Sequence, residues 1–220
     1  MRTVRVTCRG VSPLLMDRMT DEVLGGLITG VRPELRKDRP LPEVAADKIY
    51  RDTNDGHRIG LPAEMLFASL VKAGQNVKRG KKQISTADST TLPDFLSITD
   101  FFLPLVGIDP ANESASWKVD KRRGRLTSGK TVTTIGIVRP RFDAWQFDVN
   151  IQYDNAKVDD STVKTLFTNA GSTQGLGAFR PNCKGPFGRF VVTGWNTVAK
   201  DETEEVPAEV IETAEATATV

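Results

Sequence analysis

Apolar and polar residues alternate near the amino terminus, where Val4, Val6 and Cys8 are separated by Arg5 and Thr7. This period of two is typical of a strand that is buried on one face. Further strands are expected where β-branched and aromatic residues alternate or cluster. The expected ranges are residues 98–105, 131–138, 142–153 and 189–195. Strand candidates are therefore spread over the whole chain.

Two segments have the period of an amphipathic helix. Residues 63–76 follow Pro62 and place Leu66, Leu70 and Ala73 on one stripe. Residues 162–170 follow the polar pair Asp160-Ser161, which is expected to cap the helix, and Gly171 is expected to end it. A shorter helix is expected at residues 42–50, which begin with a proline.

The order of these elements is strand, helix, several strands, helix and strand. That order predicts an α+β fold with a ferredoxin-like (RRM-like) core, in which an antiparallel sheet packs against two main helices. Residues 17–42 and 78–130 are too long to be simple connections and are expected to be large insertions. The expected domain spans residues 1–199, and residues 200–220 form a separate tail.

The charge is distributed unevenly along the 220 residues, although the net charge is only +2. Residues 201–220 contain seven acidic residues and no lysine or arginine, which leaves 30 basic against 21 acidic residues in the preceding part and a net charge of +9 there. The tail also lacks aromatic residues, so it is expected to be disordered. It either screens the basic body from polyanions or acts as a plain solubilising tail.

Several classes of function lack support in the sequence. The apolar runs are too short to span a membrane, and the amino terminus resembles a strand more than an export signal, so a cytoplasmic protein is expected. The two cysteines, Cys8 and Cys183, are too few and too scattered for a disulfide framework or a zinc site. No phosphate-binding loop or dinucleotide fingerprint occurs, so no cofactor is expected. His57 is the only histidine, which excludes a histidine pair as a catalytic or metal-binding site.

Positive charge combined with glycine and phenylalanine is the strongest remaining signal. Residues 171–190 hold five glycines between residues 171 and 188, and glycine backbone can approach a ligand closely. Cations bind phosphates, and aromatic rings stack on bases, as a single-stranded nucleic acid requires. The candidate contact residues are Gly175, Gly177, Phe179, Arg180, Lys184, Phe187 and Arg189 in this segment, and Lys78, Arg79, Lys81, Lys82, Arg122, Arg123, Arg125, Arg139 and Arg141 elsewhere. The alternative is a glycine-rich hairpin with ordinary surface charge, whose phenylalanines belong to the core.

Three segments together resemble the RAMP superfamily, the RRM-like proteins of CRISPR effector complexes. They are the opening strand with residues 10–15 (Gly-Val-Ser-Pro-Leu-Leu), the strand-to-helix segment 59–70, and the glycine-rich loop with Gly-Leu-Gly-Ala-Phe-Arg at 175–180 and Gly-Pro-Phe-Gly-Arg-Phe at 185–190. In the second segment, Glu64 and Ala68 depart from the family pattern, which has a serine and a glycine or basic residue there. The chain also resembles a group of prophage proteins that share the glycine-rich end.

The resemblance implies a subunit that assembles side by side with copies of itself along a guide RNA, with other effector-complex subunits as further partners. The expected function is therefore non-catalytic binding of single-stranded nucleic acid, RNA in preference to DNA, without a metal or cofactor. Three alternatives stay open: a phage protein that binds single-stranded DNA or RNA, an endoribonuclease that uses His57 or an aspartate, and a structural phage protein.

Overall fold

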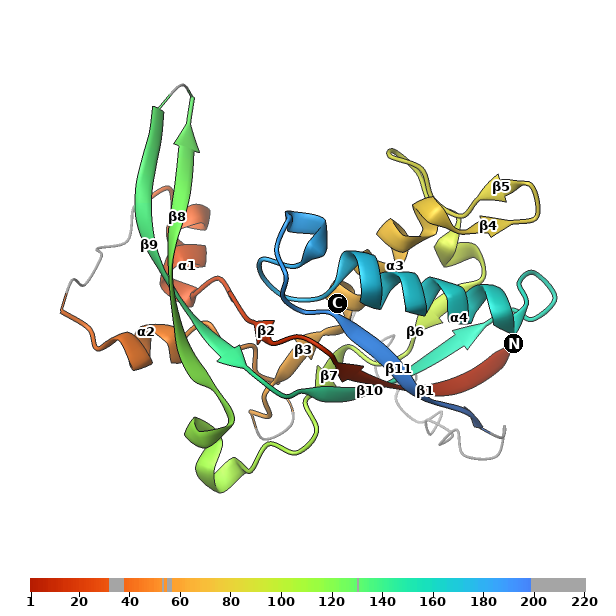
Figure 1. Ribbon diagram of the computed structural model, residues 1–220, viewed down its shortest axis with the longest axis horizontal. Coiled ribbons are helices and arrows are strands. Elements are labelled where there is room, and N and C mark those ends of the chain that lie inside the picture. Colours follow the sequence, from red (N-terminus) through yellow and green to blue (C-terminus); the bar gives the residue numbers. More distant parts are fainter. Residues whose placement is uncertain (32–37, 53, 55–56, 130, 199–220) are drawn as a thin grey trace, which may run out of the picture.

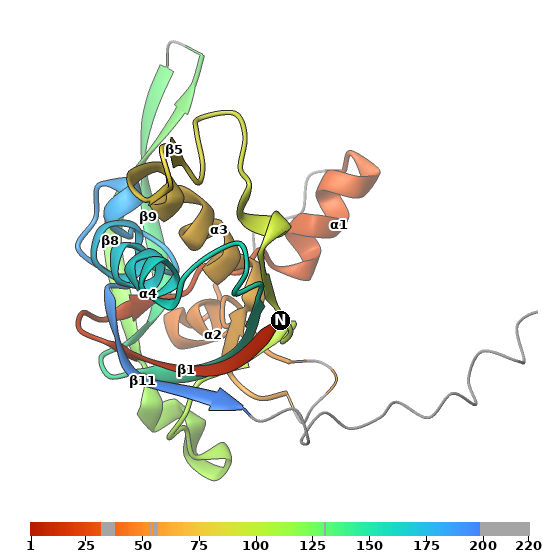
Figure 2. The ribbon, with the colours of Figure 1, turned by 90° about the vertical axis from the view of Figure 1, so that its right-hand side faces the viewer.

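The computed structural model describes residues 1–31, 38–52, 54, 57–129 and 131–198. The acidic tail expected at residues 200–220 lies outside these described residues. At the centre of the structure is a four-stranded antiparallel sheet, with α3 and α4 packed on one of its faces (Figures 1 and 2). The elements of this core are β1 (Arg2–Gly10), α3 (Ala63–Ala73), β6 (Leu96–Ile98), β10 (Gln146–Tyr153), α4 (Asp160–Asn169) and β11 (Phe190–Val198).

The order of the strands across the sheet is β11-β1-β10-β6. Together with the chain order strand, helix, two strands, helix, strand, this is the ferredoxin-like arrangement. The expected α+β fold is thus confirmed. β6 is a core strand, although residues 78–130 were expected to be an insertion, because it pairs with the end of β10 through Ile98 opposite Ile151.

The core lies between the sheet and the two helices. Side chains alternate across each strand, so every second residue of β1 and β10 is buried. Their buried residues include Val4, Val6, Cys8, Phe147, Val149 and Ile151. They pack with the apolar stripes of the helices, which are Leu66, Leu70 and Ala73 on α3 and Val163, Leu166 and Phe167 on α4.

A second sheet has the order β2-β9-β8 and carries the most prominent projection of the molecule. Its strands are β2 (Leu14–Leu15), β8 (Lys118–Ser128) and β9 (Thr131–Phe142). β2 pairs only with the last residues of β9, so most of β8 and β9 forms a two-stranded hairpin that rises from the body at the left of Figure 1. The β8–β9 hairpin is thus exposed over most of its length.

The remaining elements belong to neither of these two sheets. They are α1 (Asp21–Thr29), α2 (Leu41–Ala46), the pair β3 (Gly60–Pro62) with β7 (Phe102–Pro104), and the small hairpin β4 (Lys78–Arg79) with β5 (Lys82–Gln83). Short 3-10 turns lie at residues 74–76, 92–94, 110–116 and 181–183. Among the described residues no helix is long and apolar enough to cross a membrane.

Several element boundaries differ from the expectation. The single strand expected at residues 98–105 is two short strands in different sheets, and Arg139-Pro140-Arg141 lies inside β9 as its continuation. Asp159, not the Asp160-Ser161 pair, caps α4, because its carboxylate accepts a hydrogen bond from the Thr162 amide at 2.7 Å. Gly171 does not end that helix, which continues as a π-turn over Ala170–Gln174.

Candidate nucleic-acid interface

The β8–β9 hairpin and the glycine-rich segment face each other across a groove of about 510 Å³. The groove separates two parts of the chain that are far apart in the sequence but both rich in arginine. The lining residues are Arg122, Arg123, Gly124, Arg125, Ile137, Arg139, Ala178, Phe179, Arg180 and Cys183. Five of these ten residues are arginines, so the groove is suited to a polyanion.

The glycine-rich segment is held in place by hydrogen bonds of its own backbone. The amide of Ala178 donates to the Leu15 carbonyl at 2.8 Å, and the amide of Gly188 donates to the Pro13 carbonyl at 2.8 Å. Within the segment, the amides of Leu176 and Gly185 donate to the carbonyls of Gly188 and Arg180. These amides are therefore used for folding, and they are not arranged as an open nest for phosphate.

Glycine is required in this segment because backbone passes close to backbone. A Cβ atom at Gly185 would lie 1.7 Å from the Phe179 carbonyl oxygen, and one at Gly188 would lie 1.9 Å from the Leu176 carbonyl oxygen. Gly188 also has a φ of +69°, which favours glycine. The candidates Gly175 and Gly177, which have φ values of +70° and +71°, likewise approach neighbouring protein atoms. Packing within the chain thus explains the glycines, and their contact with a nucleic acid stays a prediction.

The two phenylalanines of the segment have different environments. Phe187 is 7% exposed, and the Arg122 guanidinium lies 4.5 Å above its ring, so it joins the segment to the hairpin. Phe179 is 39% exposed and lines the groove with a φ of +50°, which is rare for a bulky residue. A strained, exposed aromatic residue beside arginines is a candidate for base stacking.

Some of the arginines expected to bind phosphate are paired with aspartates. Arg122 donates to both carboxylate oxygens of Asp120, at 2.6 and 2.9 Å, and Asp120 is buried. The Arg141 guanidinium lies 3.9 Å from a carboxylate oxygen of Asp120 and 2.7 Å from a carboxylate oxygen of Asp143. Hydrogen bonds from Lys118 and Arg141 lower the pKa of Asp143. Arg122 and Arg141 are therefore partly neutralised at the base of the hairpin.

Arg139 is anchored in the same way. It donates to Asp17 at 2.6 Å and is largely buried, and Lys48 lies 3.1 Å from the other oxygen of that carboxylate. Burial alone would raise the pKa of Asp17, but the hydrogen bond from Arg139 and the charge of Lys48 outweigh it and hold the pKa below its ordinary value. This cluster connects β9 to the region between β2 and α1.

Other cations of the groove remain available. Arg123 and Arg125 are exposed, and neither forms an ion pair with any residue that the structure describes. Arg180 lines the groove from the opposite wall, and its guanidinium donates to the Gly177 carbonyl at 2.8 Å. That bond orients the side chain without neutralising its charge. Arg123, Arg125 and Arg180 are thus the cations best placed to bind phosphate here.

Lys184 and Arg189 are exposed at the same segment but do not line the groove. Lys184 has a φ of +60° and follows the 3-10 turn Pro181–Cys183. The Arg189 guanidinium donates to the Ser172 carbonyl, and its amide donates to the Ser12 hydroxyl at 2.9 Å. Arg189 therefore holds the glycine-rich segment against the body.

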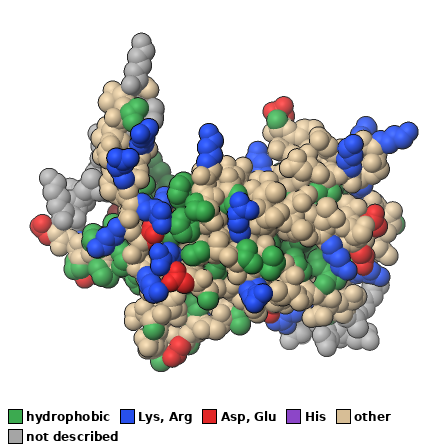
Figure 3. Space-filling view, in the orientation of Figure 1, with side chains coloured by type: hydrophobic (Ala, Val, Ile, Leu, Met, Phe, Trp, Pro, Cys, Tyr) green, Lys and Arg blue, Asp and Glu red, His purple; other side chains and the backbone are tan. Residues whose placement is uncertain are grey.

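The candidate cations Lys78, Arg79, Lys81 and Lys82 lie in the β4–β5 hairpin. Lys78 pairs with Gln83 and Arg79 with Lys82 across the hairpin, and Lys81 lies in the turn. Arg79 lies 4.9 Å above the ring of the buried Phe95. This hairpin is at the other end of the molecule from β8–β9 but projects toward the same side, and lysine and arginine side chains gather on both in Figure 3.

The structure thus brings most of the candidates onto one side of the molecule, but not into one site. The aspartates Asp17 and Asp120 are the important residues that sequence reasoning missed. No local signal identifies Asp17, because it pairs with an arginine 122 positions away, whereas Asp120 pairs with Arg122, which is only two positions away.

Catalytic groups do not converge on this groove. His57 is exposed in the turn before β3, where its carbonyl accepts a hydrogen bond from Arg51 at 3.1 Å. No cluster of three histidine, cysteine or acidic residues that could hold a metal ion occurs within the described part of the chain. The burial of Cys8 raises the pKa of its thiol far above the ordinary range, so this cysteine stays a protonated core residue.

Comparison with known proteins finds similarity among solved structures only. No protein-family model matches the chain, and no curated protein does. A chain of the cryo-EM structure titled "Type III-B Cmr-beta bound to cognate target RNA" is similar, with a TM-score of 0.40 and 12% sequence identity. The similarity covers 90% of this chain and 61% of that chain, so this chain spans about three-fifths of its length.

Proposed function

We propose that the protein binds single-stranded nucleic acid, RNA in preference to DNA, without cleaving it. The strand follows the groove between the β8–β9 hairpin and the glycine-rich segment. Its phosphates contact Arg123, Arg125 and Arg180, and one base stacks on Phe179. The β4–β5 hairpin contacts the strand further along the same side of the molecule.

One observation carries this proposal: an exposed phenylalanine lies in a groove that also contains three arginines, Arg123, Arg125 and Arg180, that form no ion pair with the described residues. Stacking on an aromatic side chain requires a base that is not already stacked in a duplex. Phosphate contacts by arginine add affinity that depends on salt and not on sequence. The combination favours a single strand bound with little sequence preference.

The biological setting is also part of the proposal. The resemblance of the opening strand, the strand-to-helix segment and the glycine-rich loop to the RAMP superfamily supports a repeating subunit of a CRISPR-type ribonucleoprotein in the cytoplasm. Copies of the chain would then lie side by side along a guide RNA, with other effector subunits as further partners. A non-catalytic role is supported by the sequence, whose single histidine has no second histidine to act with.

The test is a titration of labelled oligonucleotides followed by fluorescence anisotropy. Single-stranded RNA, single-stranded DNA of the same sequence and duplex RNA are compared over a range of salt concentrations. We expect single-stranded RNA to bind most tightly and its affinity to fall steeply with salt. Equal or tighter binding of DNA would favour a phage single-strand-binding protein, and binding of none of the three would refute the proposal.

The double variant Arg123→Ala/Arg125→Ala locates the site. Each lost contact with a single strand lowers the slope of log affinity against log salt by about 0.7, so the pair is expected to lower it by about 1.4 and to weaken binding about 25-fold at 0.1 M salt. The control is Arg5→Ala/Arg9→Ala, which removes two positive charges from the sheet face opposite the helices, where Arg5 is paired with Asp148. An equal loss in the control would show that net charge, and not this groove, binds the strand.

The same mixtures test catalysis. Labelled RNA is incubated with excess protein, with and without a divalent metal, and analysed on a denaturing gel. The proposal predicts intact RNA under both conditions. Cleavage that disappears in a His57→Ala variant would instead assign an endoribonuclease activity.

A further inference from the structure

Helix α1 has its apolar side turned to the solvent. Val23, Leu24, Leu27 and Ile28 follow the spacing of one helical stripe, and all four are exposed. Ile28 is 77% exposed and Leu27 is 66% exposed. The half-buried residues of this helix are instead its two glycines, Gly25 and Gly26. A contiguous exposed apolar stripe of this kind marks an interaction surface.

The low intrinsic stability of helix α1 also indicates that it binds a partner. The helix has nine residues, none of them buried, and isolated helices shorter than about 12–15 residues are marginal in water. Each internal glycine costs about 1 kcal/mol relative to alanine. Figure 2 shows α1 standing away from the sheets and the other helices. Contact with the rest of its own chain therefore contributes little to its stability.

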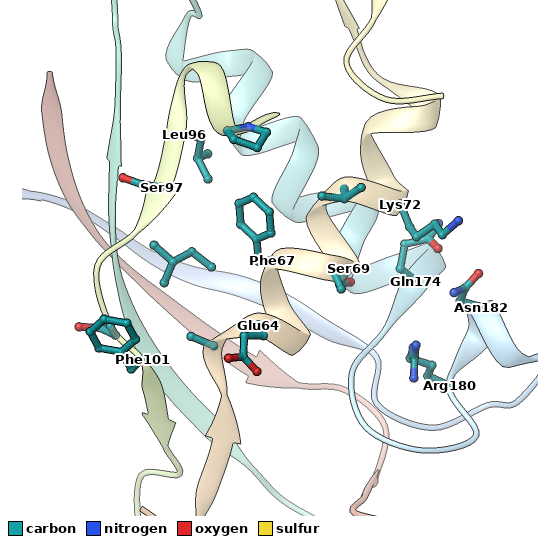
Figure 4. A pocket seen from close by; sticks show the side chains of 16 residues that line it. Glu64, Phe67, Ser69, Lys72, Leu96, Ser97, Phe101, Gln174, Arg180 and Asn182 are labelled. Atoms are coloured by element: carbon teal, nitrogen blue, oxygen red, sulfur yellow. The ribbon is translucent and has the colours of Figure 1, made fainter. Parts of the chain in front are cut away.

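The same chain contains an apolar groove of about 750 Å³, and no described residue fills it. One wall is the outer side of α3 with Phe67, and the other is the β6 region with Leu96, Ile98 and Phe101. Phe67 points into the centre of the groove in Figure 4, and Phe101, which is 95% exposed, lies at one end. The lining is predominantly apolar, as a groove that receives a helix requires.

Charge at one end of the groove matches the first turn of α1: the groove is lined by the bases Lys72 and Arg180 as well as by the acids Glu64 and Asp100, and in α1 Asp21 is already paired with Arg18. The first turn of α1 carries Asp21 and Glu22, and its last turn carries no basic residue. Lys72 and Arg180 both lie on the side of the groove away from Phe101 (Figure 4). The acidic first turn and the absence of a basic face also argue against an anionic membrane as the partner.

We infer that α1 of one copy docks in the groove between α3 and β6 of a second copy. The helix and the groove are different patches of the same chain, and Figure 1 places α1 at the left and α3 and β6 right of the centre. Such a contact is head-to-tail, so it repeats into a row or a ring of copies. This inference rests on the side-by-side assembly of the proposed function, for which it names the contact surfaces, but it does not depend on nucleic-acid binding.

The experiment measures self-association of the full chain without nucleic acid, by sedimentation velocity over a range of protein concentrations. We expect the wild-type protein to form oligomers whose size increases with concentration. The helix variant Leu27→Glu/Ile28→Glu and the groove variant Phe101→Glu change exposed residues, so both are expected to fold, which circular dichroism checks. Each is expected to weaken association by about 30-fold or more, the loss typical of a hot-spot residue.

Mixing the two variants tests the head-to-tail geometry. The helix variant keeps an intact groove and the groove variant keeps an intact helix, so an equimolar mixture can form one contact and only one. The expected product is a heterodimer that does not grow further. The matched control Val106→Glu, an exposed apolar residue outside both surfaces, is expected to associate like the wild type.

A wild-type protein that stays monomeric at all concentrations would overturn the inference, and so would a mixture of the two variants that stays monomeric while the wild type associates. Binding of RNA by a monomeric wild type would leave the proposed function standing, so the two failures are distinguishable.

Discussion

The β8–β9 and β4–β5 hairpins contain similar clusters of cations in the sequence but hold them differently in the structure. At the base of β8–β9, Arg122, Arg139 and Arg141 are paired with aspartates, while Arg123 and Arg125 remain unpaired among the described residues. In β4–β5, Arg79 lies on Phe95, and the lysines extend from a hairpin with two residues in each strand. The difference teaches that a count of cations overestimates the number that can bind phosphate.

The two hairpins also differ in the phenylalanine that lies beside each of them. Beside β8–β9, Phe179 is exposed to a groove wall of arginines, whereas the phenylalanine beside β4–β5 is buried in the core. Stacking and phosphate binding can thus occur together only at β8–β9. We therefore expect the strand to be held chiefly at that hairpin, and the following variants test this difference.

Phe179→Ala is expected to have the largest effect. Loss of one stacked base costs about 2 kcal/mol, which weakens binding about 30-fold. The salt dependence stays unchanged because no charge is removed. Anisotropy with an oligonucleotide of about eight nucleotides, which one protein molecule occupies, measures the loss. Phe101→Ala, which removes a more exposed ring from the other groove, is the control and should bind like the wild type.

Lys81→Ala/Lys82→Ala is expected to have a smaller effect. These lysines lie at the end of a small hairpin with no opposite wall, where water and salt screen them. Binding should weaken less than 5-fold, compared with about 25-fold for the same loss of charge in Arg123→Ala/Arg125→Ala. The two double variants are compared in the same salt titration, and equal losses would show that the hairpins contribute alike.

Asp17→Asn is expected to lower the stability of the fold. Because the pKa of Asp17 is lower in the folded protein than in the unfolded chain, its carboxylate stabilises the fold above pH of about 3.9. This contribution is lost as the pH falls through the folded-state pKa. The variant should be less stable than the wild type by about 1 kcal/mol at pH 7, a value discounted for the partial exposure of the pair. Urea unfolding at pH 7 and at pH 3 measures it, and the difference should shrink at the lower pH.

Periodicity was sufficient to predict the core of the fold. Alternation in β1 and the stripe on α3 identify elements whose burial is set by their own sequence. The β8–β9 hairpin was harder to predict, because β8 carries cations on both faces and has no apolar side. The expectation for α1 was an irregular insertion, since its glycines and its outward apolar stripe obscure the helix.

The candidate site was predicted only in part, for a physical reason. Composition identifies arginines, but their availability depends on aspartates that are distant in sequence, such as Asp17 for Arg139. The glycines of residues 171–190 indicate close approach without indicating what approaches. In the structure, backbone carbonyl groups of the chain itself are what approaches Gly185 and Gly188.

The most direct measurement of the central claim is photo-crosslinking of single-stranded RNA that contains 4-thiouridine, with mass spectrometry of the crosslinked peptides. The account predicts that the main crosslinks fall on the segment that contains Phe179 and on β8 around Arg123 and Arg125. It also predicts that Phe179→Ala removes the first of these. Crosslinks confined to the β4–β5 hairpin, or to the face of β1 and β10 that is opposite the helices, would contradict it.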